Sequence, residues 1–236
     1  MTNKILLKKR FFVVIHTLTN GLDHAVKETK VAKENGADGV FLIHDYEKGK
    51  SKMATTDDQL RYVAALKKIF PDFMIGVNFL KNPAFFADKV YQLNPSLIQE
   101  DGLSVLKLNR KDLPQTEFFC GVAFKYSNNV NLTGEKLKTH CDQIAQDSDV
   151  PTTSGDATGS SANLEKIREI RHYLPPEKRL GLASGVTEEN IHSYLKAGVT
   201  DFLVATSLIH HVDENDFDIL DPLKVSKLSE IIHSYN

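Results

Sequence analysis

Residues 180–207, which read LGLASGVTEENIHSYLKAGVTDFLVATS, contain the pattern that decides the fold. Two short apolar runs, 180–183 and 202–205, flank a segment in which Thr187 can cap a helix with Ile191 and Leu195 on one face. Each run ends in small polar residues at the point where a helix can begin. A strand followed by a helix and a second strand predicts a parallel sheet with crossover helices.

The same alternation extends through the whole chain. We expect strands at 11–15, 40–43, 74–79, 97–99, 118–124, 150–153, 180–183 and 202–205. These runs lack a regular apolar–polar alternation, which is typical of strands that are buried on both faces. The stretch 102–115 is a poor helix, so the fourth unit looks reduced. The pattern predicts an α/β protein, a (β/α)8 TIM barrel with a reduced fourth βα unit, as one domain over 1–236. A doubly wound open sheet is the alternative, disfavoured because no G-x-G-x-x-G follows the first strand.

Composition excludes several classes of protein. Lys and Arg number 29 against 31 for Asp and Glu, so a net charge of −2 argues against nucleic acid but permits a local phosphate pocket. No apolar run approaches the roughly 20 residues of a membrane span, and the run 11–15 is too short for a signal peptide. Cys120 and Cys141 lie in apolar patterns, which predicts buried, reduced thiols. We therefore expect a cytoplasmic protein without a membrane partner, and a homo-oligomer stays open.

Candidate catalytic residues follow the predicted strands, because a TIM barrel forms its active site at the carboxyl ends of its strands. These candidates are Lys125, Asp156, His16, Glu100 and Asn78. The lysine could pair with an anion, stabilise an enolate or form a Schiff base, and Asp156, His16 or Glu100 could transfer protons. Ordinary roles stay open, such as an ion pair for the lysine or an Asx turn at Asp156.

Metal and lid candidates are weaker. Glu100 and Asp101 could bind a divalent cation together with Asp45, but no spacing rule requires it, so we predict neither a metal nor a cofactor. His44 ends the second predicted strand. The histidine pair His210 and His211 is expected in an exposed loop. The loop 45–55 contains Lys48, Lys50 and Lys52 and is a candidate lid or a solvated basic loop.

The loops after the last three predicted strands are rich in glycine, serine and threonine. Glycine lets backbone N–H groups approach an anion, and helix N-termini favour negative charge. Late strands are also where barrel phosphate sites usually lie. The predicted phosphate-binding residues are Ser154, Gly155, Thr158, Gly159, Ser184, Gly185, Thr206 and Ser207.

Several of these segments resemble the BtpA/SgcQ family of predicted TIM-barrel enzymes. The resemblance is carried by 149–159, by 182–191, by 201–208 and by 76–80, and Lys125 falls where the family has a Lys-His pair after strand five. The chain departs from the family at Tyr126 and at His44, and the match is good over 150–209 and patchy before it. The late motifs are shared with ribulose-phosphate-binding barrels. The resemblance therefore implies a barrel with a phosphate site more than it implies one reaction.

These observations favour an enzyme that acts on a small phosphorylated sugar or a nucleotide-like ligand. The expected chemistry is proton transfer beside a carbonyl, as an isomerase or a lyase. Two alternatives stay open. One is a nucleoside or phosphoribosyl enzyme that acts on a glycosidic bond, and the other is a non-catalytic, phosphate-binding assembly factor of the BtpA type.

Overall fold

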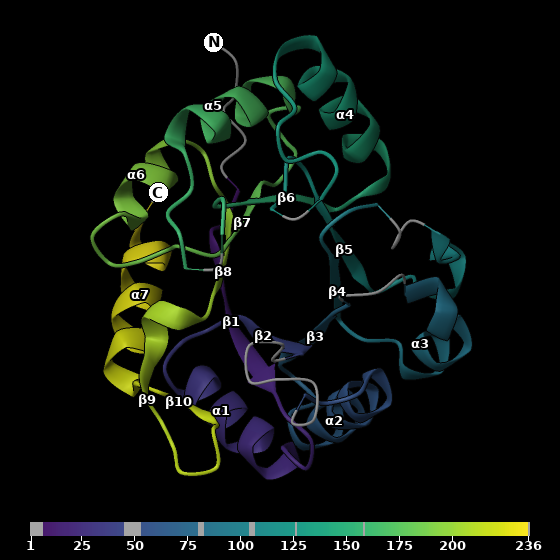
Figure 1. The fold of residues 1–236 in the computed structure, drawn as a ribbon, viewed down its shortest axis with the longest axis vertical. Helices are drawn as coiled ribbons and strands as arrows, with labels where there is room; N and C mark the ends of the chain where they lie inside the picture. Colours follow the sequence, from purple (N-terminus) through teal and green to yellow (C-terminus); the bar gives the residue numbers. More distant parts are fainter. Residues whose placement is uncertain are drawn as a thin grey trace.

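The computed structural model describes residues 7–44, 53–79, 83–103, 107–125, 127–157 and 159–235. Strands and helices alternate along these residues, as Figure 1 shows. The strands are β1 (Arg10–Thr17), β2 (Gly39–His44), β3 (Met74–Asn78), β4 (Leu97–Glu100), β5 (Glu117–Gly121), β6 (Val150–Ser154), β7 (Gly181–Ala183), β8 (Asp201–Val204), β9 (Ile209–Val212) and β10 (Asp218–Leu220). The α-helices are α1 (Leu22–Glu34), α2 (Thr56–Ile69), α3 (Ala87–Leu93), α4 (Gly134–Asp147), α5 (Leu164–Tyr173), α6 (Ile191–Lys196) and α7 (Pro222–Ser234).

Strands β1 to β8 form a closed parallel barrel in sequence order, and β8 pairs with β1 to complete it. The helices surround this barrel on the outside (Figure 1). The predicted (β/α)8 TIM barrel is confirmed. Between β4 and β5 the described residues form only the 3-10 turn η3 (Arg110–Asp112), so the fourth unit is reduced as predicted. None of the described helices is long and apolar enough to cross a membrane.

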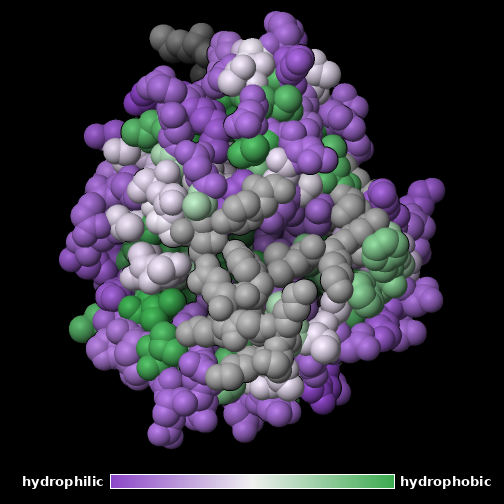
Figure 2. Space-filling view, in the orientation of Figure 1, coloured by the Kyte–Doolittle hydropathy of each residue, from purple (hydrophilic) through white to green (hydrophobic). Residues whose placement is uncertain are grey.

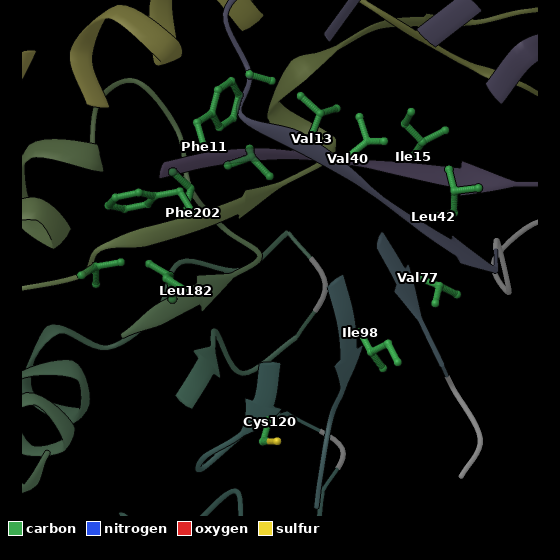
Figure 3. Packing of buried hydrophobic residues seen from close by; sticks show 14 of the residues in the cluster. Phe11, Val13, Ile15, Val40, Leu42, Val77, Ile98, Cys120, Leu182 and Phe202 are labelled. Carbon is green, nitrogen blue, oxygen red and sulfur yellow. The ribbon is translucent and has the colours of Figure 1, made fainter. Parts of the chain in front are cut away.

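Burial on both faces explains why the strand sequences lack alternation. Residues such as Val13, Val40 and Phe202 point outward and pack under the helices (Figure 3). The residues between them point inward, where the rings of Phe12, Phe41 and Phe119 lie 5.2–5.8 Å apart, edge to face. An inner and an outer apolar layer therefore share the same strands.

The amino end of the barrel is closed by ion pairs. Arg10 donates to Asp201 at 2.6 Å and to both carboxylate oxygens of Glu117 at 2.7 and 2.8 Å. Arg179 donates to the second oxygen of Asp201 at 2.7 Å, and Asp201 is 0% exposed. Arg10 and Asp201 lie side by side in the β1–β8 register and form a buried network with Glu117 and Arg179.

The strand predicted at 118–124 is too long, because β5 ends at Gly121. Ala123 has φ of 44°, a left-handed conformation that turns the chain away from the strand. A Cβ atom at Gly121 would lie 1.9 Å from the carbonyl oxygen of Asp101, so the loop after β4 passes directly over this glycine. Lys125 therefore lies in the loop after β5 and not at the end of the strand.

An antiparallel hairpin of β9 and β10 lies between β8 and α7 and was not predicted. It packs against α1 (Figure 1), which places residues close to the C-terminus beside the first strand of the barrel. Figure 2 shows hydrophobic side chains over β9 and the start of α7, where Val212 and Leu223 are exposed. Most of the other side chains along the edge of the molecule in this view are hydrophilic.

Candidate active site

A cavity of about 620 Å³ opens at the carboxyl ends of the barrel strands, where the sequence placed the site. Residues from all eight strands or from the loops that follow them line it. Most of the predicted site residues are among them: His16, Asn78, Glu100, Lys125, Gly159, Ser184, Gly185, Thr206 and Ser207. One cavity therefore brings together the predicted catalytic residues of the early strands and the predicted anion-binding residues of the late ones.

The loop after β7 offers backbone donors to this cavity. Ser184 and Gly185 both adopt positive φ, 72° and 70°. Within the described part of the chain, the N–H groups of Gly185 and Val186 have no acceptor. Thr187 does have one, because its N–H donates to Oδ1 of Asn190 at 2.8 Å. Two unsatisfied N–H groups at a cavity wall are typical of an anion-binding loop.

The glycines of the late loops have a packing role that the sequence interpretation missed. A Cβ atom would lie 2.0 Å from the carbonyl oxygen of Ser160 if placed on Gly155, and 1.9 Å if placed on Gly185. The Ser160 carbonyl therefore lies between the two glycines and locks the β6 and β7 loops together. Gly159 is different, because its φ is 73° but, apart from its chain neighbours, no atom of the described residues lies within 4 Å of its Cβ position.

Of the remaining residues that were predicted to bind an anion, some line the cavity and others do not. Thr206 is exposed at the cavity rim in the short turn η4 (Thr206–Leu208), and the Ser207 hydroxyl donates to the carbonyl of Val186 at 2.7 Å. Ser154 is buried and is not among the lining residues, because its hydroxyl donates to the carbonyl of Gly155 at 2.9 Å. Thr158 lies outside the described residues.

Lys125 is buried at the cavity wall and is held by the end of β6 and by the loop after β7. Its backbone N–H donates to the hydroxyl of Ser154 at 2.8 Å, and its Nζ donates to the hydroxyl of Ser184 at 3.3 Å. The second contact brings the ammonium group to the loop that carries the unsatisfied N–H groups. Positive charge and backbone donors therefore meet on one side of the cavity.

The opposite wall, formed by β3 and β4, is rich in acceptors. Asn78 is 7% exposed, and its Oδ1 has no hydrogen-bond partner among the described residues. Burial raises the pKa of Asp101 to about 6, although a hydrogen bond from Gln99 at 3.0 Å and the charge of Lys125 favour its ionised form. Glu100 lies above Gly102, within 3.3 Å of the Cβ position of that glycine. This wall can accept hydrogen bonds from a ligand.

His16 projects into the cavity from the end of β1. Its Nδ1 lies 2.8 Å from Oδ2 of Asp218, a residue of the hairpin strand β10. The sequence interpretation singled out His16 but missed Asp218. A carboxylate next to a histidine in space, and 202 positions away in sequence, leaves no local signal.

Other sequence candidates lie away from this arrangement. Asp156 is exposed and does not line the cavity. Burial lowers the pKa of Lys166, and the charge of Asp156 partly offsets this effect. His44 is buried, with Nδ1 at 2.5 Å from the carbonyl of Ala54. The histidine pair 210–211 is exposed as expected, but it lies on strand β9 and not in a loop. The candidates Asp45, Lys48, Lys50 and Lys52 and the position of Tyr126 lie outside the described residues. No group of three potential metal ligands occurs among the residues that are described.

Lys166 is a further residue that the sequence did not reveal. From α5 its Nζ donates to the carbonyls of Ser154 at 2.6 Å and Ala123 at 3.3 Å. It joins the ends of β5 and β6 beneath the loop that contains Lys125. One of the two carbonyls belongs to the left-handed Ala123, so this contact depends on the bend after β5.

No protein-family model and no curated protein matches the chain in sequence. The resemblance to the BtpA/SgcQ family therefore stays a prediction. Solved structures do match. Phosphoribosyl anthranilate isomerase from Thermus thermophilus superposes with a TM-score of 0.64 at 14% identity, over 96% of this chain and 100% of that chain. Orotidine 5'-phosphate decarboxylase from Pyrococcus horikoshii OT3 superposes with a TM-score of 0.62 at 13% identity, over 95% of this chain and 98% of that chain. Thiamine phosphate pyrophosphorylase from Pyrococcus furiosus superposes with a TM-score of 0.64 at 14% identity, over 94% of this chain and 95% of that chain. The chain thus shares its TIM-barrel fold with enzymes that are each named for a phosphorylated compound.

Proposed function

We propose that the chain is an enzyme that acts on a small phosphorylated ligand by proton transfer beside a carbonyl. The observation that carries this proposal is the contact between Lys125 and Ser184 in a cavity whose β7 loop presents unsatisfied N–H groups. A phosphate on the N–H groups of Gly185 and Val186 would place the adjoining carbon skeleton beside the Lys125 ammonium group. The similarity to enzymes of phosphorylated compounds agrees with this arrangement.

The phosphate is assigned to the side of the cavity formed by the last three strands. Gly159, Ser184, Gly185, Thr206 and Ser207 line that side. Lys125 is the cationic lining residue of that side. A dianionic phosphate binds more tightly to donors that are already fixed in place, because less ordering is needed on binding. Ser154 and Gly155 support the loop behind this surface and do not contact the ligand directly.

Lys125 would stabilise negative charge that develops on the carbonyl oxygen during enolate formation. The charge of Lys125 counteracts the rise that burial causes in the pKa of Asp101, so the two groups interact across the cavity. A neutral Lys125 amine would form an imine, whereas the ammonium form would give electrostatic assistance. His16 and Glu100 face the same space and are the residues to which we assign proton transfer, and the exposed Asp156 is the weaker assignment.

The wall opposite the phosphate defines the other end of the ligand. A buried acceptor without a partner, such as Oδ1 of Asn78, costs about 1–3 kcal/mol until a donor reaches it. Asn78 would therefore accept a hydrogen bond from a ligand hydroxyl or amino group. A phosphorylated polyhydroxy aldehyde or ketone satisfies both ends of the cavity.

Calorimetric titration with inorganic phosphate and ribose 5-phosphate tests the anion site. Thr206→Asp adds a negative charge at an exposed rim position, and we expect at least a roughly tenfold loss of affinity, equal to about 1.4 kcal/mol. Thr139→Asp adds the same charge to an exposed position of α4 and is the control. Equal affinity in the wild type and Thr206→Asp would refute the anion site.

Deuterium exchange tests the chemistry. A panel of aldose and ketose phosphates in D2O should show exchange at the carbon next to the carbonyl, detected by proton NMR. Lys125→Met should abolish the exchange, whereas Lys136→Met, an exposed lysine of α4, should leave it unchanged. Borohydride with the same ligands should trap an adduct on Lys125 if an imine forms. Full exchange in Lys125→Met would remove this residue from the mechanism.

A further inference from the structure

We infer that His16 and Asp218 form an acid–base dyad, in which Asp218 orients the imidazole so that Nε2 is the proton-transferring atom of the cavity. The inference rests on the proposed function and specifies its acid–base group. Asp218 contacts the histidine and not the cavity of the proposed substrate, so it is a positioning residue.

The direction of the His16 side chain follows from the strand. Phe12 belongs to the inner apolar layer, Val14 packs against that layer, and alternation along β1 turns His16 to the same side. Val14 and His16 both line the cavity. One ring nitrogen of His16, Nδ1, is engaged by Oδ2 of Asp218 at 2.8 Å. The other, Nε2, is the nitrogen left for a ligand.

The bond to Asp218 also fixes the tautomer. An ionised carboxylate can only accept a hydrogen bond, so Nδ1 must carry the proton and Nε2 keeps its lone pair. A neutral histidine held in this form is ready to accept a proton. Once Nε2 is protonated, the carboxylate stabilises the resulting imidazolium, as a positioned carboxylate does in other acid–base pairs.

The hairpin is built to hold Asp218 in place. Nε2 of His24 on α1 lies 2.8 Å from the backbone carbonyl of Asp218, and the His24 ring stacks on Phe217 at 4.6 Å. The backbone N–H of Leu220 donates to Oε2 of Glu28 at 2.9 Å. Two buried side chains of one helix therefore anchor the residues on each side of Asp218. Mere closure of the barrel between β8 and α7 does not require such a hairpin.

The charges around His16 suit a proton acceptor. On the outer side are Asp218 from β10 and Glu28 from α1, which share a small cavity with His16. On the cavity side are Glu100 and Asp101 at the end of β4. Lys125 follows β5, which is diametrically opposite β1 in an eight-stranded ring in sequence order. Carboxylates therefore lie on both sides of the histidine, while the cation lies across the cavity.

The proton step balances within this arrangement. Nε2 takes the proton from a carbon next to the ligand carbonyl, and the electron pair of the C–H bond passes to the carbonyl oxygen as an enolate opposite the Lys125 ammonium group. Return of the same proton to the former carbonyl carbon restores neutral His16. The isomer forms as the proton of the neighbouring hydroxyl group moves to the original carbonyl oxygen, so that the carbonyl shifts by one carbon. No oxidant, reductant or metal takes part in this step.

The tautomer can be observed without any ligand. Long-range ¹H–¹⁵N correlation spectra at pH 8 should show the His16 ring with its proton on Nδ1 in the wild type. In Asp218→Asn the amide group can donate to Nδ1, which moves the proton to Nε2. Glu214→Gln makes the same carboxylate-to-amide change at an exposed position of the hairpin and should leave the spectrum unchanged. A wild-type ring with its proton on Nε2 would overturn the dyad, and this measurement needs no variant to fold.

Reactivity supplies the second readout. Diethyl pyrocarbonate attacks the unprotonated ring nitrogen, and mass spectrometry measures its rate at His16. A wrong tautomer that is about nine-tenths populated leaves about a tenth of the reactive form, so Asp218→Asn should react about tenfold more slowly. Equal rates in the wild type and Asp218→Asn would overturn the inference. The expected tautomer and rates without deuterium exchange on any sugar phosphate would support the dyad and refute the proposed carbonyl chemistry.

Discussion

The contact between the β6 and β7 loops can be measured by one substitution and a matched control. Gly185 and Gly159 have almost the same φ, 70° and 73°, so an alanine at either position adopts the same unfavourable backbone conformation. That conformation costs about 1–2 kcal/mol for an L-residue. Only at Gly185 does the new Cβ atom meet the Ser160 carbonyl oxygen, at 1.9 Å.

Overlap with a backbone atom that cannot rotate away adds about 1–3 kcal/mol, which brings Gly185→Ala to about 2–5 kcal/mol. With an unfolding entropy near 2.1 cal/mol/K per residue, 236 residues give about 0.5 kcal/mol/K. We therefore expect Tm to fall by about 4–10 °C in Gly185→Ala and by about 2–4 °C in Gly159→Ala. Differential scanning calorimetry measures both values. Equal losses would refute the packing role that we assign to Ser160, and Gly185→Asp would be a poor probe of anion binding for the same steric reason.

Three further predictions concern buried groups. Asp201→Asn leaves two guanidinium groups short of a carboxylate, so unfolding in urea should show a loss of about 3–5 kcal/mol, and a loss under about 1 kcal/mol would contradict the network. The pKa of Asp101 is raised to about 6, so the folded protein binds this proton more tightly and stability falls as pH rises from about 4 to 6. Between pH 4 and pH 7 the unfolding free energy of Asp101→Asn should therefore rise by about 2 kcal/mol relative to that of the wild type, and a constant difference in unfolding free energy would exclude the shift. Burial raises the pKa of both Cys120 and Cys141 to about 12, so thiol titration should find two reactive groups only after denaturation without reductant.

The barrel could be predicted from the sequence because its signal is local. Each strand is a short apolar run that is buried on both faces, as at Val13 and Val40, and all but the fourth are followed by a helix-period segment. The reduced fourth unit was visible for the same reason, because 102–115 has no such period. Strand limits were less certain. The end of β5 depends on the left-handed Ala123 and on the loop that crosses Gly121, and both are tertiary effects.

The candidate site was predictable only in part. Strand-end positions gave His16, Asn78 and Lys125, because topology alone carries them to one end of the barrel. Residues that act through distant partners were missed. Asp218 meets His16 only through the hairpin, and Lys166 reaches its carbonyls only through the bend after β5. Spacing in the sequence contains no trace of either contact.

The hairpin has a consequence for the order in which the protein is made. Synthesis on the ribosome releases His16 early, whereas Asp218 and the anchoring residue Leu220 emerge after β8, the strand that closes the ring against β1. Nascent chains that end before residue 218 lack the group that orients His16, however well their first strands have formed. The atom that we propose for proton transfer is therefore oriented only after β10 has been made and has docked on α1, long after β1 itself has been made.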